Sequence, residues 1–220
     1  MIQATDKASI RNAVNRFGPA PGAQAMLSLE MQAAQLAIER GLYITWRSPS
    51  TRHECTRVGP GCKCFCGHFF QDHDINKKTN PCQACVCKRF QFIPQRPEEV
   101  GEWWLPRRKE FNINTYRVKC KCNHTHEEHN PNTQSCVLCP CYRFESNFLC
   151  LVCDKHWEEH EVFYEMEWER RAEGRTTGQE FLPLAQDRDI QEAVFNNPRP
   201  PVQFVRPQQK KGKVGKIMKK

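Results

Sequence analysis

The regular part of the hydrophobic pattern lies towards the two ends of the chain. Ile10, Val14 and Phe17 recur at helical spacing, which predicts a first helix. Residues 23–40 are rich in Ala, Met, Leu, Gln and Glu, and Gly41 is a typical helix stop, so a second helix is predicted there. We interpret both helices as packing elements of a small fold.

The C-terminal part of the chain predicts one longer and one shorter helix. The stretch from His160 to about Arg171 is strongly acidic and is interpreted as a long helix. Residues 187–195 predict a short helix, and five prolines between positions 183 and 207 predict an otherwise extended tail.

Fourteen Cys and eight His among 220 residues change this picture. The hydrophobic fraction of 39% includes the cysteines, so few side chains remain to form a core. The length allows one or two small domains and excludes a large enzyme. No run approaches the roughly 18 apolar residues of a transmembrane helix, and the N-terminus lacks an apolar leader. We therefore expect a soluble cytoplasmic chain, whose reduced thiols favour metal binding over disulfides.

The cysteines and histidines form an internal repeat in the middle of the chain. The pattern C-x-C-x-H-x4-H, followed by C-x2-C-x-C, occurs twice, and its first part recurs after 56 residues. The first copy consists of Cys64, Cys66, His68, His73, Cys82, Cys85 and Cys87. The second copy consists of Cys120, Cys122, His124, His129, Cys136, Cys139 and Cys141. Such ordered repetition indicates metal ligands.

A third, different element follows the second copy: Cys150, Cys153, His156 and His160. The linker between the copies carries Trp103 and Trp104, which we interpret as a lid over a small core. The predicted organisation is N-terminal helices in 1–52, a first zinc repeat in 53–95, a Trp/Pro linker in 96–117, a second zinc repeat in 118–148, a Cys/His element with the acidic helix in 149–174, and a Pro-rich basic tail in 175–220. The expected fold is small, irregular and zinc-stabilised, with flanking α-helices, extended tails and little regular core.

Zinc explains this residue pattern better than other metals do. Structural zinc sites are closed by four Cys or His ligands, and a C-x2-C pair directs two sulfurs at one ion. Iron–sulfur clusters would not explain paired histidines at a fixed spacing.

Seven ligands in each copy do not divide by four. One alternative is that a cysteine bridges two ions in each copy; the other is that an extra group completes each set. Cys62 in the first copy and His126 in the second are the candidates for the extra group, and both are taken as ligands here. With the third element this predicts about four to five zinc ions. His53 and Cys55 are left over.

Most enzyme and nucleic-acid motifs are absent. The third element lacks the spacing of a zinc finger, which needs about 12 residues between its Cys pair and its His pair. The string from His156 to His160 fits the H-x-x-E-H pattern of a class of zinc peptidases, with Glu159 as the general base. The cysteines immediately upstream would fill the open position that catalysis needs, so we expect no enzyme activity.

The run KCKCNHTHEEHNP, the later CVLCPCYRFESNFLCLVCDKHWEEHEVFYE and the linker PEEVGEWWLPRR together resemble the eukaryotic family named "family with sequence similarity 221". The resemblance covers about residues 60–165 and includes the Cys and His positions named above. It implies a small cysteine-rich protein without an assigned catalytic activity, in a family associated with ciliated eukaryotes.

The net charge of +8 lies in the tail. Residues 197–220 carry eight Lys and Arg and no acidic residue, which leaves residues 1–196 neutral by count. We therefore expect a structural or adaptor protein that docks to protein partners in a larger assembly, with a ciliary or axonemal, microtubule-associated setting as the preferred one. The alternative is a zinc module that binds nucleic acid with help from the basic tail.

Overall fold

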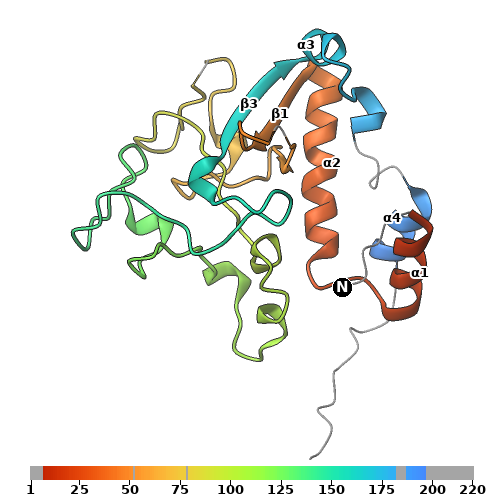
Figure 1. Ribbon diagram of the computed structural model, residues 1–220, viewed down its shortest axis with the longest axis horizontal. Coiled ribbons are helices and arrows are strands. Elements are labelled where there is room, and N and C mark those ends of the chain that lie inside the picture. The colour runs from red at the N-terminus through yellow and green to blue at the C-terminus, as the bar shows by residue number, and fades with distance from the viewer. Residues whose placement is uncertain (1–6, 52, 78, 182–186, 197–220) are drawn as a thin grey trace, which may run out of the picture.

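The computed structural model describes residues 7–51, 53–77, 79–181 and 187–196 (Figure 1). Its helices and strands are α1 (Lys7–Phe17), α2 (Ala23–Arg40), β1 (Leu42–Arg47), β2 (Thr56–Arg57), β3 (Glu161–Met166), α3 (Glu167–Ala172) and α4 (Arg188–Phe195). Helices α1, α2 and α4 lie where the pattern predicts helices. The predicted extended tail falls partly on residues 182–186 and 197–220, outside the described residues.

A three-stranded antiparallel sheet in the order β2-β1-β3 lies beside α2 (Figure 1). In its register Ile44 pairs with Tyr164, and Arg47 pairs with Glu161. Because β1 precedes the cysteine-rich region and β3 follows it, the sheet brings the two ends of that region together.

The prediction of a long acidic helix after His160 is wrong, because Glu161–Met166 forms β3 and only Glu167–Ala172 is helical. Val162 and Tyr164 pack against the core, and Arg47 lies over the ring of Phe163. β-Branched and aromatic residues favour such a half-buried strand, and here they outweigh the acidic composition.

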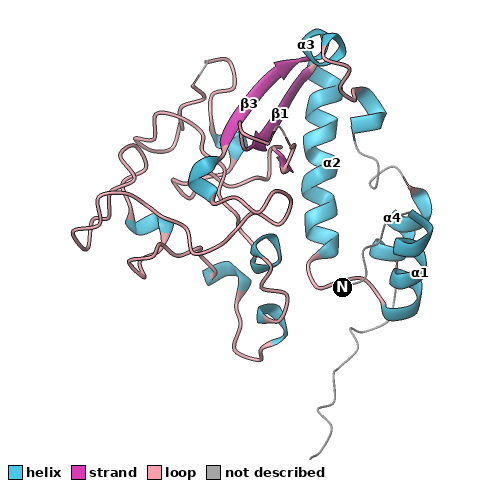
Figure 2. Cartoon of the chain, in the orientation of Figure 1, coloured by secondary structure: helices cyan, strands magenta, loops and turns pink. Residues whose placement is uncertain are grey.

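The middle of the chain is irregular and consists of loops with short 3-10 turns (Figure 2). Its core is nevertheless continuous, since aromatic residues between the cysteines pack on one another. The ring of Phe65 lies 5.1 Å from that of Phe144 and 5.4 Å from that of Trp157. Trp103 and Trp104 are 43% and 57% exposed, so their interpretation as a lid over the core is wrong.

A buried ion cluster fixes the loop between β1 and β2 against α3. The fully buried Arg170 donates to Glu54 at 2.6 Å and to Glu165 at 2.9 Å. Glu54 directly precedes Cys55, so this cluster also holds Cys55 in place.

Helix α2 packs closely on the loop after β2. A Cβ added at Gly59 would lie 2.6 Å from the backbone nitrogen of Ala33, so this approach requires glycine. Within the described residues, no helix is long and apolar enough to cross a bilayer.

Candidate metal centres

Among the described residues, thirteen cysteines and five histidines form five four-residue clusters, and in each cluster the candidate ligand atoms lie within 4.8 Å of one another. The clusters are Cys64, Cys66, His73 and Cys87; Cys66, His68, Cys82 and Cys85; Cys120, Cys122, His129 and Cys141; Cys122, His124, Cys136 and Cys139; and Cys55, Cys150, Cys153 and His160. The sequence predicts all of these ligands except Cys55.

One cysteine is shared between the two clusters of each copy. Cys66 belongs to both clusters of the first copy, and Cys122 belongs to both clusters of the second. The sequence leaves open whether a cysteine bridges two ions or an extra group completes each set. The structure has the shared cysteine that the first alternative requires. We call the two resulting pairs of clusters the first and second double centres, and the cluster with Cys55 the single centre.

The spacing of the ligand atoms fits a tetrahedral metal ion. Zinc–sulfur bonds of about 2.3 Å give a sulfur–sulfur edge of about 3.8 Å in a tetrahedron. The Sγ atoms of Cys64 and Cys87 are 3.9 Å apart, and those of Cys120 and Cys141 are 3.8 Å apart. A disulfide would need about 2.05 Å, and all fourteen cysteines are free thiols. The donor atoms are thus placed for a metal rather than for an oxidised bond.

Three imidazoles are oriented by hydrogen bonds to backbone carbonyls. One of them lies in the first double centre, one in the second double centre and one in the single centre. His73 donates its Nδ1 proton to the carbonyl of Phe69 at 2.8 Å, and His129 donates to Thr125 at 2.8 Å. His160 makes the same bond at 2.7 Å to the residue four positions earlier. Each bond leaves Nε2 free to ligate and fixes the orientation of the ring, as outer-shell partners of metal-bound histidines do.

The acidic residue before each of these histidines organises the turn that carries the accepting carbonyl. Asp72 accepts the backbone N–H of Phe69 at 3.0 Å, and Glu128 accepts that of Thr125 at 2.6 Å. Glu159 accepts the N–H of His156 at 3.2 Å. The carboxylates thus support the imidazoles through the backbone of a 3-10 turn, without contacting the rings.

The third element is a shortened copy of the repeat. In all three elements the second cysteine lies seven residues before the Nε2 histidine, and the residue after that cysteine has a positive φ. The Cys–His pairs are Cys66–His73, Cys122–His129 and Cys153–His160. The positive-φ residues are Gly67, Asn123 and Asp154. Lys155 then occupies the position of His68 and His124, so this element lacks the ligands of a second ion.

The sheet supplies the fourth ligand of the single centre. Cys55 donates its backbone N–H to the carbonyl of Trp46 at 3.1 Å, next to the ladder between β1 and β2. His160 directly precedes β3, and its imidazole stacks on the Trp46 ring at 3.9 Å. Pairing of β1 with β3 therefore brings Cys55 to His160. Sequence reasoning missed Cys55 because it took His156 as the fourth ligand of this element, although only two residues separate His156 from Cys153.

Three predicted ligands lie outside the clusters. Cys62 is buried at the position that Val118 occupies in the second copy, and burial raises the pKa of its thiol to about 12. His126 is buried as well, and its Nδ1 bonds to the carbonyl of Phe65 at 3.0 Å. Burial lowers the pKa of His126 to about 4, so the ring is neutral. Both side chains belong to the core rather than to a metal centre.

His156 occupies the turn position of Phe69 and Thr125, which are not ligands, and it is absent from the clusters. The H-x-x-E-H string therefore forms a 3-10 turn, Trp157–Glu159, rather than the α-helix that would put both histidines on one face. His160 lies among three cysteines instead.

A single substitution distinguishes Cys55 from Cys62. Cys55→Ala is expected to remove one of five metal ions, because the single centre loses a ligand. Cys62→Val, which installs the residue of the second copy, is expected to keep all five. Metal analysis by mass spectrometry under native conditions measures both. If Cys62→Val lost an ion and Cys55→Ala lost none, the assignment of the single centre would be wrong.

The chain matches known proteins over the region that holds all five clusters. The family model described as Protein FAM221A/B matches residues 25–101 and 107–191. Protein FAM221B of Homo sapiens is 46% identical over 155 residues, which cover 68% of this chain and 39% of the relative. Protein FAM221A of Xenopus tropicalis is 31% identical over 163 residues, covering 68% and 48%. The chain thus spans less than half of either relative's length, and no solved structure matches it.

Proposed function

The chain belongs to the FAM221 family, and we propose that it is a non-enzymatic structural or adaptor protein built on five zinc ions. The observation that carries this proposal is that every cluster offers four Cys or His ligands, a complete tetrahedral set. Catalytic zinc keeps one position open for water, whereas structural zinc is closed by protein groups. Thiolates mixed with imidazoles also select zinc over harder cations such as Mg²⁺ and Ca²⁺.

Zinc in this proposal replaces regular secondary structure as the source of stability. Binding energy at a structural site is folding energy, because the unfolded chain has no preformed site. The irregular region between β1 and β3 would then be a rigid platform, and its surface would be available for docking to a larger assembly. The setting we propose is a cilium or axoneme, which rests on the family's association with ciliated eukaryotes.

Fractionation of ciliated cells tests the proposed setting. The tagged full chain is expected to stay with axonemes after detergent removes the ciliary membrane, and zinc should remain bound. A chain that is released entirely into the detergent-soluble fraction as a monomer would contradict the axonemal role.

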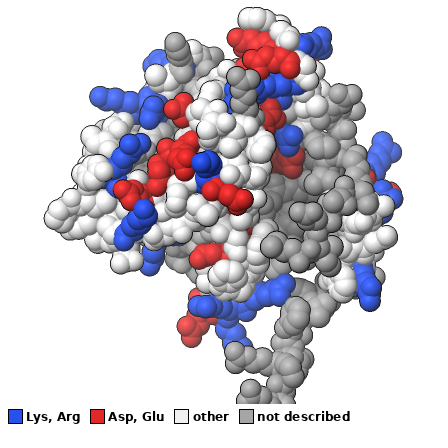
Figure 3. All heavy atoms as spheres, viewed as in Figure 1, with Lys and Arg blue, Asp and Glu red and all other residues white. Residues whose placement is uncertain are grey.

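The alternative is binding of nucleic acid through the basic tail. On the face shown in Figure 3, cations and carboxylates are interspersed, and residues 1–196 are neutral by count. Under this alternative, deletion of residues 197–220 abolishes salt-sensitive binding to DNA or RNA. Under the adaptor proposal the shortened chain still joins its assembly. The third candidate, a zinc peptidase, has the weakest support, because Glu159 is engaged in the turn and the single centre has four ligands.

A further inference from the structure

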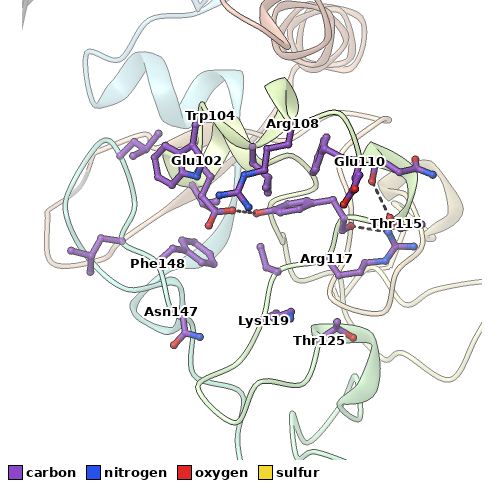
Figure 4. A pocket seen from close by; sticks show the side chains of 18 of the residues that line it. Glu102, Trp104, Arg108, Glu110, Thr115, Arg117, Lys119, Thr125, Asn147 and Phe148 are labelled. Carbon is purple, nitrogen blue, oxygen red and sulfur yellow. Dashed lines mark hydrogen bonds between the residues drawn. The ribbon is translucent and has the colours of Figure 1, made fainter. Parts of the chain in front are cut away.

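A groove of about 1270 Å³ lies between the linker and the segment around Cys150 (Figure 4). Trp104 and Arg108 lie on one side of it, and Phe148 and Lys119 lie across from them (Figure 4). Five aliphatic side chains also line it: Val100, Leu105, Val118, Leu149 and Leu151. Pockets for small ligands typically hold about 300–1,000 Å³, so this groove is large enough for a segment of polypeptide.

The groove carries cations without ion-pair partners among the described residues, on a body whose net charge is zero by count. Residues 107–121 contain six Lys and Arg against one acidic residue. Arg117 also lines the groove but is paired with Glu127 at 2.6 Å. Arg108, Lys109 and Lys119 are exposed, line the groove, and have no ion-pair partner within 4.0 Å among the described residues.

An acidic peptide fits this lining better than the other polyanions do. Glu102 and Glu110 also line the groove and interrupt its positive charge, so they would repel an unbroken row of phosphates more than a peptide whose carboxylates are separated by apolar side chains. Single-stranded nucleic acid is usually held by bases stacked on aromatic platforms, whereas here four aromatic residues share the lining with five aliphatic ones, which offer bases no stacking surface. The chain's own residues 197–220 carry only positive charges, so the cations of the groove would repel that segment. These observations leave a partner segment with both carboxylates and apolar side chains.

The metal centres hold one side of this groove. Leu149 and Leu151 flank Cys150 of the single centre, and Lys119 precedes Cys120 of the second double centre. A groove whose walls are preformed costs a partner less to order on binding.

We propose that this groove binds an acidic segment of a protein partner, whose apolar side chains contact Trp104, Leu149 and Leu151 and whose carboxylates pair with Arg108, Lys109 and Lys119. This inference rests on the proposed adaptor function and names the chemistry of the partner. It predicts binding that weakens with salt and that also requires apolar side chains in the peptide.

A synthetic probe tests the groove with the full zinc-loaded chain. A fluorescently labelled ten-residue peptide of alternating Glu and Leu is titrated with protein, and its anisotropy is measured. The double variant Arg108→Glu/Lys109→Glu is expected to weaken binding about ten-fold or more, because two attractive pairs become repulsive. The matched control Arg40→Glu/Lys88→Glu makes the same charge change at exposed residues outside the groove and should bind like the wild type. Leu151→Asp, with no cation changed, is expected to weaken binding as well.

Four results would overturn the inference: equal binding by the groove variants and the control, equal binding of a Glu/Ser peptide, tighter binding of a ten-nucleotide oligothymidylate at the same residues, or displacement of the peptide by self-association of the chain. Zinc content is measured on every sample. A chain that holds five ions and ignores the peptide contradicts the groove alone. A chain that never binds zinc contradicts the proposed function itself.

Discussion

Cys66→Ala is expected to remove two metal ions from the chain and to leave three of five. Cys66 is the only ligand common to both clusters of the first double centre, so its loss opens both coordination sets at once. A shared thiolate also screens two adjacent divalent ions from each other, and without it their repulsion adds to the missing bonds. Metal analysis after equilibration with a competing chelator measures the loss.

Cys85→Ala is the matched control, because Cys85 belongs to one cluster of the same double centre. It is expected to remove a single ion and to leave the cluster of Cys64 and His73 filled. Cys122→Ala should repeat the two-ion loss in the second copy. Equal losses of one ion from Cys66→Ala and Cys85→Ala would show that Cys66 does not bridge.

Removal of all metal is expected to unfold the region between β1 and β3. A structural zinc site contributes about 10–16 kcal/mol in small zinc peptides, whereas a whole domain is usually stable by about 5–15 kcal/mol. The core cannot compensate, because most of its aromatic residues lie in the loops that the ligands hold together. Trp157 is buried in this core, so a chelator with reductant should shift tryptophan emission to longer wavelength and abolish cooperative melting.

Addition of zinc after chelation should restore both signals, and the same chelator preloaded with zinc should have no effect. A chain that is stripped of metal but keeps its emission spectrum and its melting temperature would contradict a folding role for the metal. Helices α1, α2 and α4 carry no ligand of the clusters. The account therefore does not require the circular dichroism signal of these helices to disappear when the metal is removed.

The two double centres could be predicted from the sequence because their ligands are local and repeat. Within each copy every ligand lies within 24 residues of the others, and turns of fixed length set their geometry. The single centre could not be predicted in full, because Cys55 reaches His160 only through pairing of β1 with β3. The strand β3 was not predicted, because the acidic composition of the stretch after His160 favoured a helix there.

Comparison of the copies shows why Cys62 and His126, which were predicted as ligands, lie outside the clusters. Cys62 corresponds to Val118, and His126 corresponds to Phe70 and Trp157, all of which are buried. A position that is apolar in one copy and Cys or His in another packs in the core more readily than it ligates. The groove, by contrast, depends on how the linker folds back along the segment around Cys150, and the sequence shows only its excess of cations.

The formal charge of the metal centres follows from the same assignment. Five thiolates against two divalent ions leave each double centre at −1, and three thiolates against one ion leave the single centre at −1. Because residues 1–196 are neutral by count, divalent ions at all five centres would make this body slightly acidic.

The central claim is that Cys66 and Cys122 each bridge two ions, and the number of ions in a variant without Cys62, His126 and His156 tests it most directly. Nineteen Cys and His then remain and can close at most four sites of four ligands if none is shared, whereas two bridging cysteines allow five. Cys62→Val/His126→Phe/His156→Thr installs at each position the residue that another copy has there, so the core is kept. Mass spectrometry under native conditions is expected to count five zinc ions in the folded variant, and a count of four or fewer would contradict the shared cysteines.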